Sequence, residues 1–157
     1  MANSLCNIIS WFALAFLLAG VGCTMDMSSI TPEARTAIET KFPKADVREV
    51  QARLGGLYEI ELLQDKESLE VKLHQDGTII EIETIIDASD LPEPVMNTVT
   101  EKTKGKELKE VEKVQLLARQ TLGGLQKLEK PEVFYEIEWL EFGFEQEINV
   151  NPDGSIR

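Results

Sequence analysis

Histidine and cysteine are scarce in this 157-residue chain, which contains one histidine and two cysteines. Catalysis by a serine or cysteine nucleophile needs a base close to it, and a zinc site needs several histidine or cysteine ligands. The single histidine, His74, falls on the polar side of an alternating segment, where we expect a solvated strand residue. The composition therefore argues against an enzyme, and we expect no catalytic residues, no cofactor and no such metal site.

Basic residues are also few, with 16 lysines and arginines against 28 aspartates and glutamates, which gives a net charge of −12. Nucleic-acid binding needs clustered lysine and arginine to neutralise phosphates. We therefore predict no nucleic-acid partner, and no adsorption to an anionic membrane surface. The hydrophobic share of 43% and the charged share of 28% are typical of an ordinary globular domain.

The chain begins with a hydrophobic run that is too short to span a membrane. Residues 1–22 carry no charged side chain, and residues 8–22 are all apolar or small. A membrane-spanning helix needs about 20 apolar residues, whereas a shorter run followed by small residues is typical of a secretory signal peptide. We predict that residues 1–22 are a signal peptide and that the protein is exported, with a retained membrane anchor as the alternative.

Cys23 follows this segment directly. The sequence Leu-Leu-Ala-Gly-Val-Gly-Cys resembles the lipobox of bacterial lipoproteins, in which the cysteine is lipidated and becomes the first residue. The lipobox usually has Leu, Val or Ile three residues before the cysteine, where this chain has Gly20. We expect a lipid anchor on Cys23 and a periplasmic or outer-surface location. Cleavage without lipidation, which would give a secreted protein, is the alternative.

Two parts of the remaining chain repeat each other. Tyr-Glu-Ile-Glu at residues 58–61 recurs at 135–138, and Asp-Gly at 76–77 recurs at 153–154. Upstream the spacing is shorter, which predicts an insertion in the second copy. The predicted organisation is a signal peptide at 1–22, a flexible tether at 23–29, a first repeat at 30–88, and a second repeat at 89–157 with its insertion near 112–132.

Each copy predicts a helix followed by antiparallel strands. Thr31 before Pro32 is typical of a helix start, and Pro43 ends that helix. In the second copy the predicted helix begins near Pro92 and ends at Gly105. Alternation of apolar and polar residues predicts three or four strands after each helix, with Asp-Gly hairpins between them. The predicted fold class is α+β, built as two tandem repeats.

These motifs are similar to those of PepSY-like domains, and more closely to the exported β-lactamase-inhibitor-like, PepSY-like proteins. The resemblance is carried by Pro32 at the helix start, by Phe-Pro-Lys-Ala at residues 42–45 and by Glu-Val at residues 49–50. It implies an exported binding module, which in some relatives inhibits a protease or another enzyme. The resemblance implies no catalytic residues.

Glutamates occupy the polar positions of the predicted strands in both copies. Three interpretations remain open: a solvated face that keeps the protein soluble, a docking surface for a basic protein partner, and a site for a divalent cation. The outward glutamates are Glu59, Glu61, Glu70, Glu81 and Glu83 in the first copy, and Glu136, Glu138, Glu145 and Glu147 in the second.

The insertion and the aromatic residues after it are the other candidate contacts. Residues 116–128 are rich in leucine and contain Gly-Gly at 123–124, so they either lengthen two strands and bury their leucines, or project as a loop that contacts a partner. Parity places Trp139 in the core with Tyr135 and Ile137, and leaves Phe134 and Leu140 exposed. The candidate partner-binding residues are Glu136, Glu138, Trp139, Phe142, Leu122 and Leu125.

The sequence thus predicts an exported, non-catalytic module that binds or inhibits a protein partner in the cell envelope. The alternative is an envelope protein that binds a divalent cation or a small ligand.

Overall fold

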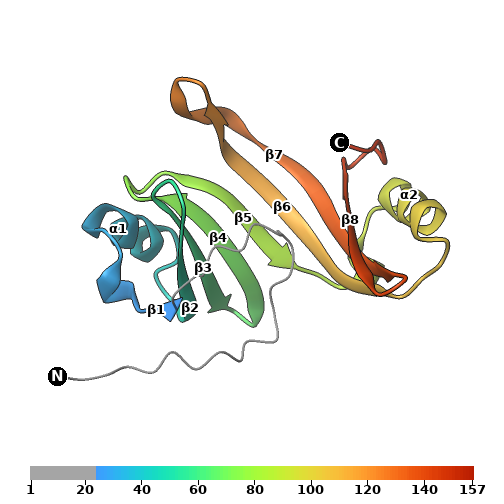
Figure 1. Ribbon diagram of the computed structural model, residues 1–157, viewed down its shortest axis with the longest axis horizontal. Helices are drawn as coiled ribbons and strands as arrows, with labels where there is room; N and C mark the ends of the chain where they lie inside the picture. The colour runs from blue at the N-terminus through green and yellow to red at the C-terminus, as the bar shows by residue number, and fades with distance from the viewer. Residues whose placement is uncertain (1–23) are drawn as a thin grey trace.

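A computed structural model describes residues 24–157 (Figure 1). The predicted signal peptide and the predicted lipidation site, Cys23, lie outside the described residues. Among those residues, none of the helices is long and apolar enough to cross a membrane. The elements in chain order are β1 (Thr24–Met25), η1 (Met27–Ser29), α1 (Pro32–Lys41), β2 (Asp46–Arg53), β3 (Leu57–Gln64), β4 (Glu67–His74), β5 (Ile79–Ile85), η2 (Ala88–Asp90), α2 (Glu93–Thr103), β6 (Leu108–Thr121), β7 (Gly124–Glu141) and β8 (Phe144–Val150).

The strands form one antiparallel sheet in which each strand pairs with the next along the chain. The prediction of two tandem helix-then-strand repeats is therefore wrong: the strands of the predicted halves belong to a single sheet. The junction is the pairing of β5 with β6, which runs from Glu81 opposite Leu116 to Ile85 opposite Glu112. The local sequence repeat does not reveal this pairing, because it records alternation within strands and not which strands are neighbours.

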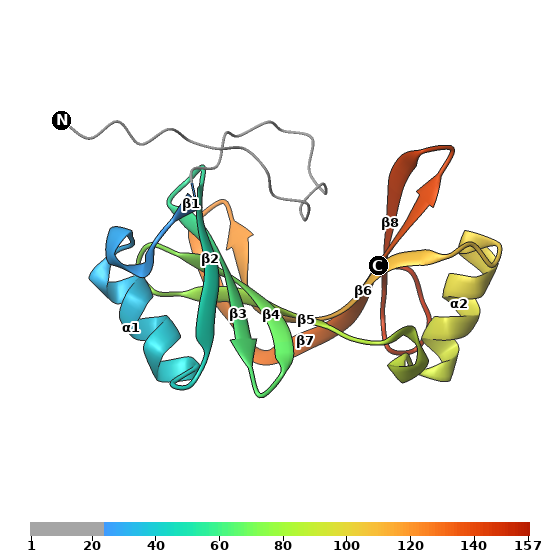
Figure 2. The same ribbon diagram turned by 90° about the horizontal axis from the view of Figure 1, so that it is seen from below.

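The two α-helices begin and end close to where the sequence predicts. The Thr31 hydroxyl accepts a hydrogen bond from the backbone N–H of Ala34 at 3.3 Å, and Pro32 takes the first helical position of α1. In α2, Lys104 follows the last helical residue in a left-handed conformation, with φ of 56°. The two helices lie at opposite ends of the sheet (Figure 2).

Both helices pack against the same face of the sheet. The α1 core contains Ile60 and Ile82, and the α2 core contains Val111 and Ile137. Ile82 of the α1 core lies opposite Gln115 on β6, so these two side chains point to the same face. Val111 of the α2 core lies four residues before Gln115 on the same regularly paired strand, and an even spacing keeps it on that face as well. No helix within residues 24–157 covers the opposite face, which we call the open face.

The segment predicted as an insertion forms the outer half of the β6–β7 hairpin, which projects beyond the rest of the sheet (Figure 1). Its strands continue past Leu116, where the pairing of β5 with β6 begins. Leu122 at its tip is fully exposed, and Leu125 is half-buried. The insertion therefore lengthens two strands, as one of the two interpretations predicted. Its leucines are not all buried, however, because Leu122 at the tip is exposed. At the other end of the chain, the predicted tether contains β1, which pairs with β2.

Candidate functional site

The open face is lined mainly by glutamates. Strand pairing and side-chain alternation place the following residues on it, among others: Glu49, Gln51, Arg53, Glu59, Glu61, Glu70, Lys72, Glu81, Glu83, Glu110, Glu112, Val114, Leu116, Glu132, Phe134, Glu136, Glu138, Leu140, Glu145, Glu147 and Asn149.

Many of these glutamates lie directly opposite one another on neighbouring strands. Glu61 pairs with Glu70, and Glu70 pairs in turn with Glu83, so that one row of carboxylates crosses β3, β4 and β5. On the long strands, Glu112 pairs with Glu136. Like charges in direct cross-strand positions destabilise a sheet. The face is therefore maintained at an electrostatic cost to the folded protein.

Lys72 neutralises the centre of the first row. Its ammonium lies 2.8 Å from Glu83, 3.1 Å from Glu81 and 3.7 Å from Glu70. Burial alone would lower the pKa of Lys72, but the charges of Glu83 and Glu81 outweigh it and the pKa is raised. Glu83 is only 5% exposed. Its burial raises the pKa to about 7, although Lys72 acts to lower it.

Two carboxylates in the middle of the open face, one on β6 and one on β7, have no such cation beside them in the described part of the chain. Within residues 24–157, neither Glu112 nor Glu136 forms an ion pair. Burial, followed by the charge of Glu83, raises the pKa of Glu112 to about 9. Burial, followed by the charge of Glu147, raises the pKa of Glu136 to about 8. The middle of the open face therefore binds protons at neutral pH and favours any group that brings positive charge.

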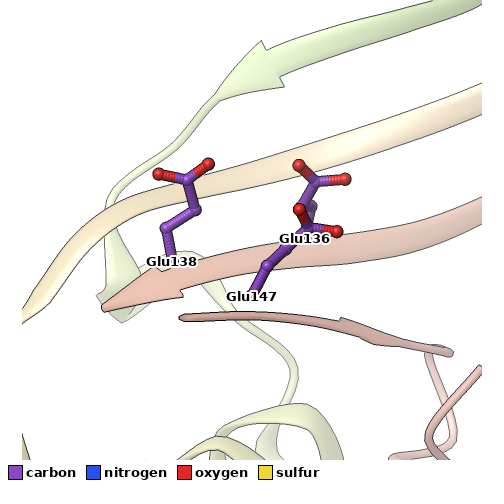
Figure 3. A group of neighbouring side chains, drawn as sticks. All are labelled: Glu136, Glu138 and Glu147. Atoms are coloured by element: carbon purple, nitrogen blue, oxygen red, sulfur yellow. The ribbon is translucent and has the colours of Figure 1, made fainter. Parts of the chain in front are cut away.

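Three carboxylates gather at the β8 side of the open face, where Glu136, Glu138 and Glu147 place one oxygen each within 4.8 Å of the others (Figure 3). Glu138 is 8% exposed, and the ammonium of Lys109 lies 3.4 Å from it. Lys109 also forms an ion pair with Glu145. This group can hold a single cation between carboxylates of adjacent strands.

The structure separates the candidate contact residues predicted from the sequence. Glu136 and Glu138 lie together on the open face. Trp139 lies on the helix-covered face and is 6% exposed, so it cannot serve as a contact on the open face. Leu122 and Phe142 flank opposite ends of β7, and both are exposed at hairpin turns.

Two features of the open face escape the sequence analysis. Glu112 lies in the predicted insertion, and reading the alternation through that segment would have placed it on the polar side of its strand. Phe134, expected to be exposed, is only 7% exposed, and the guanidinium of Arg157 lies 4.4 Å from its ring centroid. No local pattern links these residues, which are far apart in the sequence. The prediction for Leu140 is confirmed, since it is 52% exposed.

No family model matches the chain, and no curated protein matches its sequence. Several solved structures have a similar fold. A protein named as periplasmic from Bacteroides eggerthii is 15% identical, with a TM-score of 0.62 over 81% of this chain and 85% of that one. A DUF2874 family protein from Bacteroides ovatus is 13% identical, with a TM-score of 0.63 over 82% of this chain and 84% of that one. A BLIP-like protein from Bacteroides fragilis is 14% identical, with a TM-score of 0.60 over 82% and 83%.

At these identities the likeness shows the fold alone. It agrees with the inhibitor-like part of the resemblance read from the sequence, because a BLIP-like protein shares the architecture. No comparison supports the PepSY-like name or the tandem repeats. The chain has the fold of a group of Bacteroides proteins that includes DUF2874 and BLIP-like members.

Proposed function

We propose that this protein is an exported, non-catalytic module that docks its open face onto a basic surface of a protein partner in the cell envelope and inhibits or sequesters that partner. The observation that carries the proposal is the direct cross-strand pairing of carboxylates over a sheet face that no described helix covers. Solubility alone does not require carboxylates that are half-buried and opposed.

The electrostatics of the face favour a cationic partner. Glu112 and Glu136 have raised pKa values because they are buried next to other carboxylates. A lysine or arginine of a partner placed between them would reduce that repulsion and favour their charged forms. A single-signed field of this kind also accelerates the encounter with an oppositely charged surface.

The proposal includes a location in the cell envelope. Residues 1–22 act as the signal peptide, and lipidation of Cys23 tethers the domain to a membrane. Two fold neighbours, one named as periplasmic and one as BLIP-like, support an envelope protein that binds other proteins.

Charge reversal on the open face tests this proposal. We expect the Glu136→Lys/Glu147→Lys variant to lose a partner that the tagged full chain captures from detergent-solubilised native envelopes at about 0.05 M salt. The wild-type chain should lose the same partner at about 0.5 M salt, because the Debye length becomes shorter.

The matched control is Glu39→Lys/Glu101→Lys, which changes the net charge equally at exposed positions of α1 and α2. Equal loss in both variants would show that only net charge matters, and capture that resists salt would contradict electrostatic docking.

The second candidate function is divalent-cation binding, favoured by the close approach of Glu136, Glu138 and Glu147. It predicts that calcium at about 100 times its Kd stabilises the fold by about 2.7 kcal/mol, seen as a melting temperature several degrees higher. Glu136→Gln/Glu147→Gln should abolish that rise, and Glu39→Gln/Glu101→Gln should retain it. A wild-type melting temperature that is insensitive to calcium would rule this candidate out.

A further inference from the structure

Phe134 is the aromatic residue of the open face, and the chain itself covers it. Phe134 pairs with Val114 on β6 and lies two residues before Glu136 on β7. Val114 is fully buried, and Phe134 is 7% exposed. The guanidinium carbon of Arg157 lies 4.4 Å from the centroid of the Phe134 ring. An aromatic face flanked by carboxylates therefore carries a stacked cation.

The same guanidinium is held at its edge by a carboxylate. Nη2 of Arg157 donates to Oε2 of Glu132 at 2.7 Å, and the same oxygen accepts from Arg119. The hydrogen bond from Arg157 is the main cause of the lowered pKa of Glu132. Stacking on a ring combined with hydrogen bonding to a carboxylate is the arrangement that suits a planar guanidinium, and an ammonium reproduces only the charge.

Arg157 reaches this position from a turn that is anchored on the other side of the sheet. The hydroxyl of Thr98 on α2 donates to the carbonyl oxygen of Gly154 at 2.7 Å. Gly154 has φ of 87°, and a Cβ there would lie 2.7 Å from the carbonyl oxygen of Pro94. Beyond the turn, the backbone N–H of Arg157 donates to the carbonyl of Asn149 at 2.8 Å. These contacts place the side chain at the edge of the open face, where it is still 29% exposed.

We propose that Phe134 and Glu132 form an arginine-binding subsite of the open face, which Arg157 fills in the free protein and from which an arginine of the basic partner displaces it. This inference rests on the proposed docking function and names a feature of the partner: an arginine among its basic residues. The Phe134 ring stacks on the guanidinium of the incoming arginine, Glu132 accepts its hydrogen bond, and the carboxylates of the neighbouring strand positions attract the basic residues around it.

Removing the internal occupant tests the subsite. The full chain and its Arg157→Gln variant are titrated with fluorescent nonaarginine and nonalysine, which carry equal charge, and binding is followed by anisotropy. We expect Arg157→Gln to bind nonaarginine about fivefold more tightly than the wild type, a gain typical of one newly available cation–π contact. Its gain for nonalysine should match that of Arg48→Gln, which removes an exposed positive charge on β2.

Adding Phe134→Leu to Arg157→Gln should remove the extra gain for nonaarginine and leave nonalysine binding unchanged. Equal gains for the two peptides would reduce the effect to net charge and overturn the subsite, and so would the absence of any gain.

A small probe separates this result from a failure of docking. N-acetyl-arginine methylamide should shift the Phe134 ring resonances in Arg157→Gln and not in the wild type, whether or not the peptides bind. If both peptides fail to bind every variant, the docking function is wrong. If the small probe also causes no shift, the subsite is wrong as well.

Discussion

Raising the pH from about 5 to about 9 is expected to destabilise the fold by about 2–4 kcal/mol, after the large pKa shifts are discounted for partial exposure. From an ordinary value of 4.5, the pKa rises to about 7 in Glu83, to about 8 in Glu136 and to about 9 in Glu112, with burial as the main cause in each. A carboxyl group whose pKa is higher in the folded state stabilises the fold fully below its unfolded pKa. That contribution is lost as the pH rises through the folded value.

The sign is therefore opposite to that of a carboxylate stabilised by an ion pair. Such carboxylates are also present, since hydrogen bonds from Arg157 and Lys106 lower the pKa values of Glu132 and Glu141. Their contribution is lost only as the pH falls below about 4.5, outside the window in which the open face titrates.

Urea unfolding followed by circular dichroism at pH 5, 7 and 9 measures this effect. The free energy of unfolding of Glu112→Gln should equal that of the wild type at pH 5 and be larger at pH 9. The substitution removes a carboxyl group that destabilises the fold only when it is ionised. Glu39→Gln, on the exposed side of α1, should follow the wild-type curve throughout. A wild-type free energy of unfolding that stays constant or rises between pH 5 and pH 9 would show that Glu83, Glu112 and Glu136 do not have raised pKa values in the folded protein.

Lys72→Met is expected to destabilise the protein by about 2–4 kcal/mol at pH 8, because removing one partner leaves buried charge without compensation. Glu83, which is 5% exposed and lies 2.8 Å from the ammonium, would then have no ion-pair partner among residues 24–157. At pH 5 the deficit should shrink, since Glu83 then binds a proton and no longer needs a counter-charge.

The same unfolding measurement distinguishes this result from a general packing defect. Lys44→Met, at an exposed position, should change stability by less than about 0.5 kcal/mol at both pH values. A deficit in Lys72→Met that is the same at pH 5 and pH 8 would indicate lost side-chain packing. It would remove the assigned role of Lys72 as the central counter-charge.

Local features of the fold could be read from the sequence because their causes are local. The cap of Thr31 and the position of Pro32 define the start of α1 through a hydrogen bond and a fixed φ. Gly77 has φ of 82° in the predicted Asp-Gly turn, a conformation that glycine adopts readily. Alternation along β7 also placed Glu136 and Glu138 on one face, as observed.

Long-range relations could not be read in the same way. The pairing of Ile85 with Glu112 joins the two halves into one sheet, and no periodicity within a strand identifies a neighbouring strand. The cover that Arg157 provides over Phe134 is a tertiary contact between distant residues, and parity alone left that ring exposed. The sequence therefore predicted that the candidate site is acidic. It did not predict that the site extends over one continuous sheet, or that Phe134 and Arg157 are part of it.

The most direct test of the central claim is photo-crosslinking from single positions in the full chain, in its native envelope. Benzoylphenylalanine replaces Glu61 or Glu147 on the open face, or Glu39 or Glu101 on the helices of the other face. We predict one common protein adduct from positions 61 and 147, weakened by added salt, and no such adduct from positions 39 and 101. An adduct formed from the helix positions and absent from the open face would contradict the proposed docking surface.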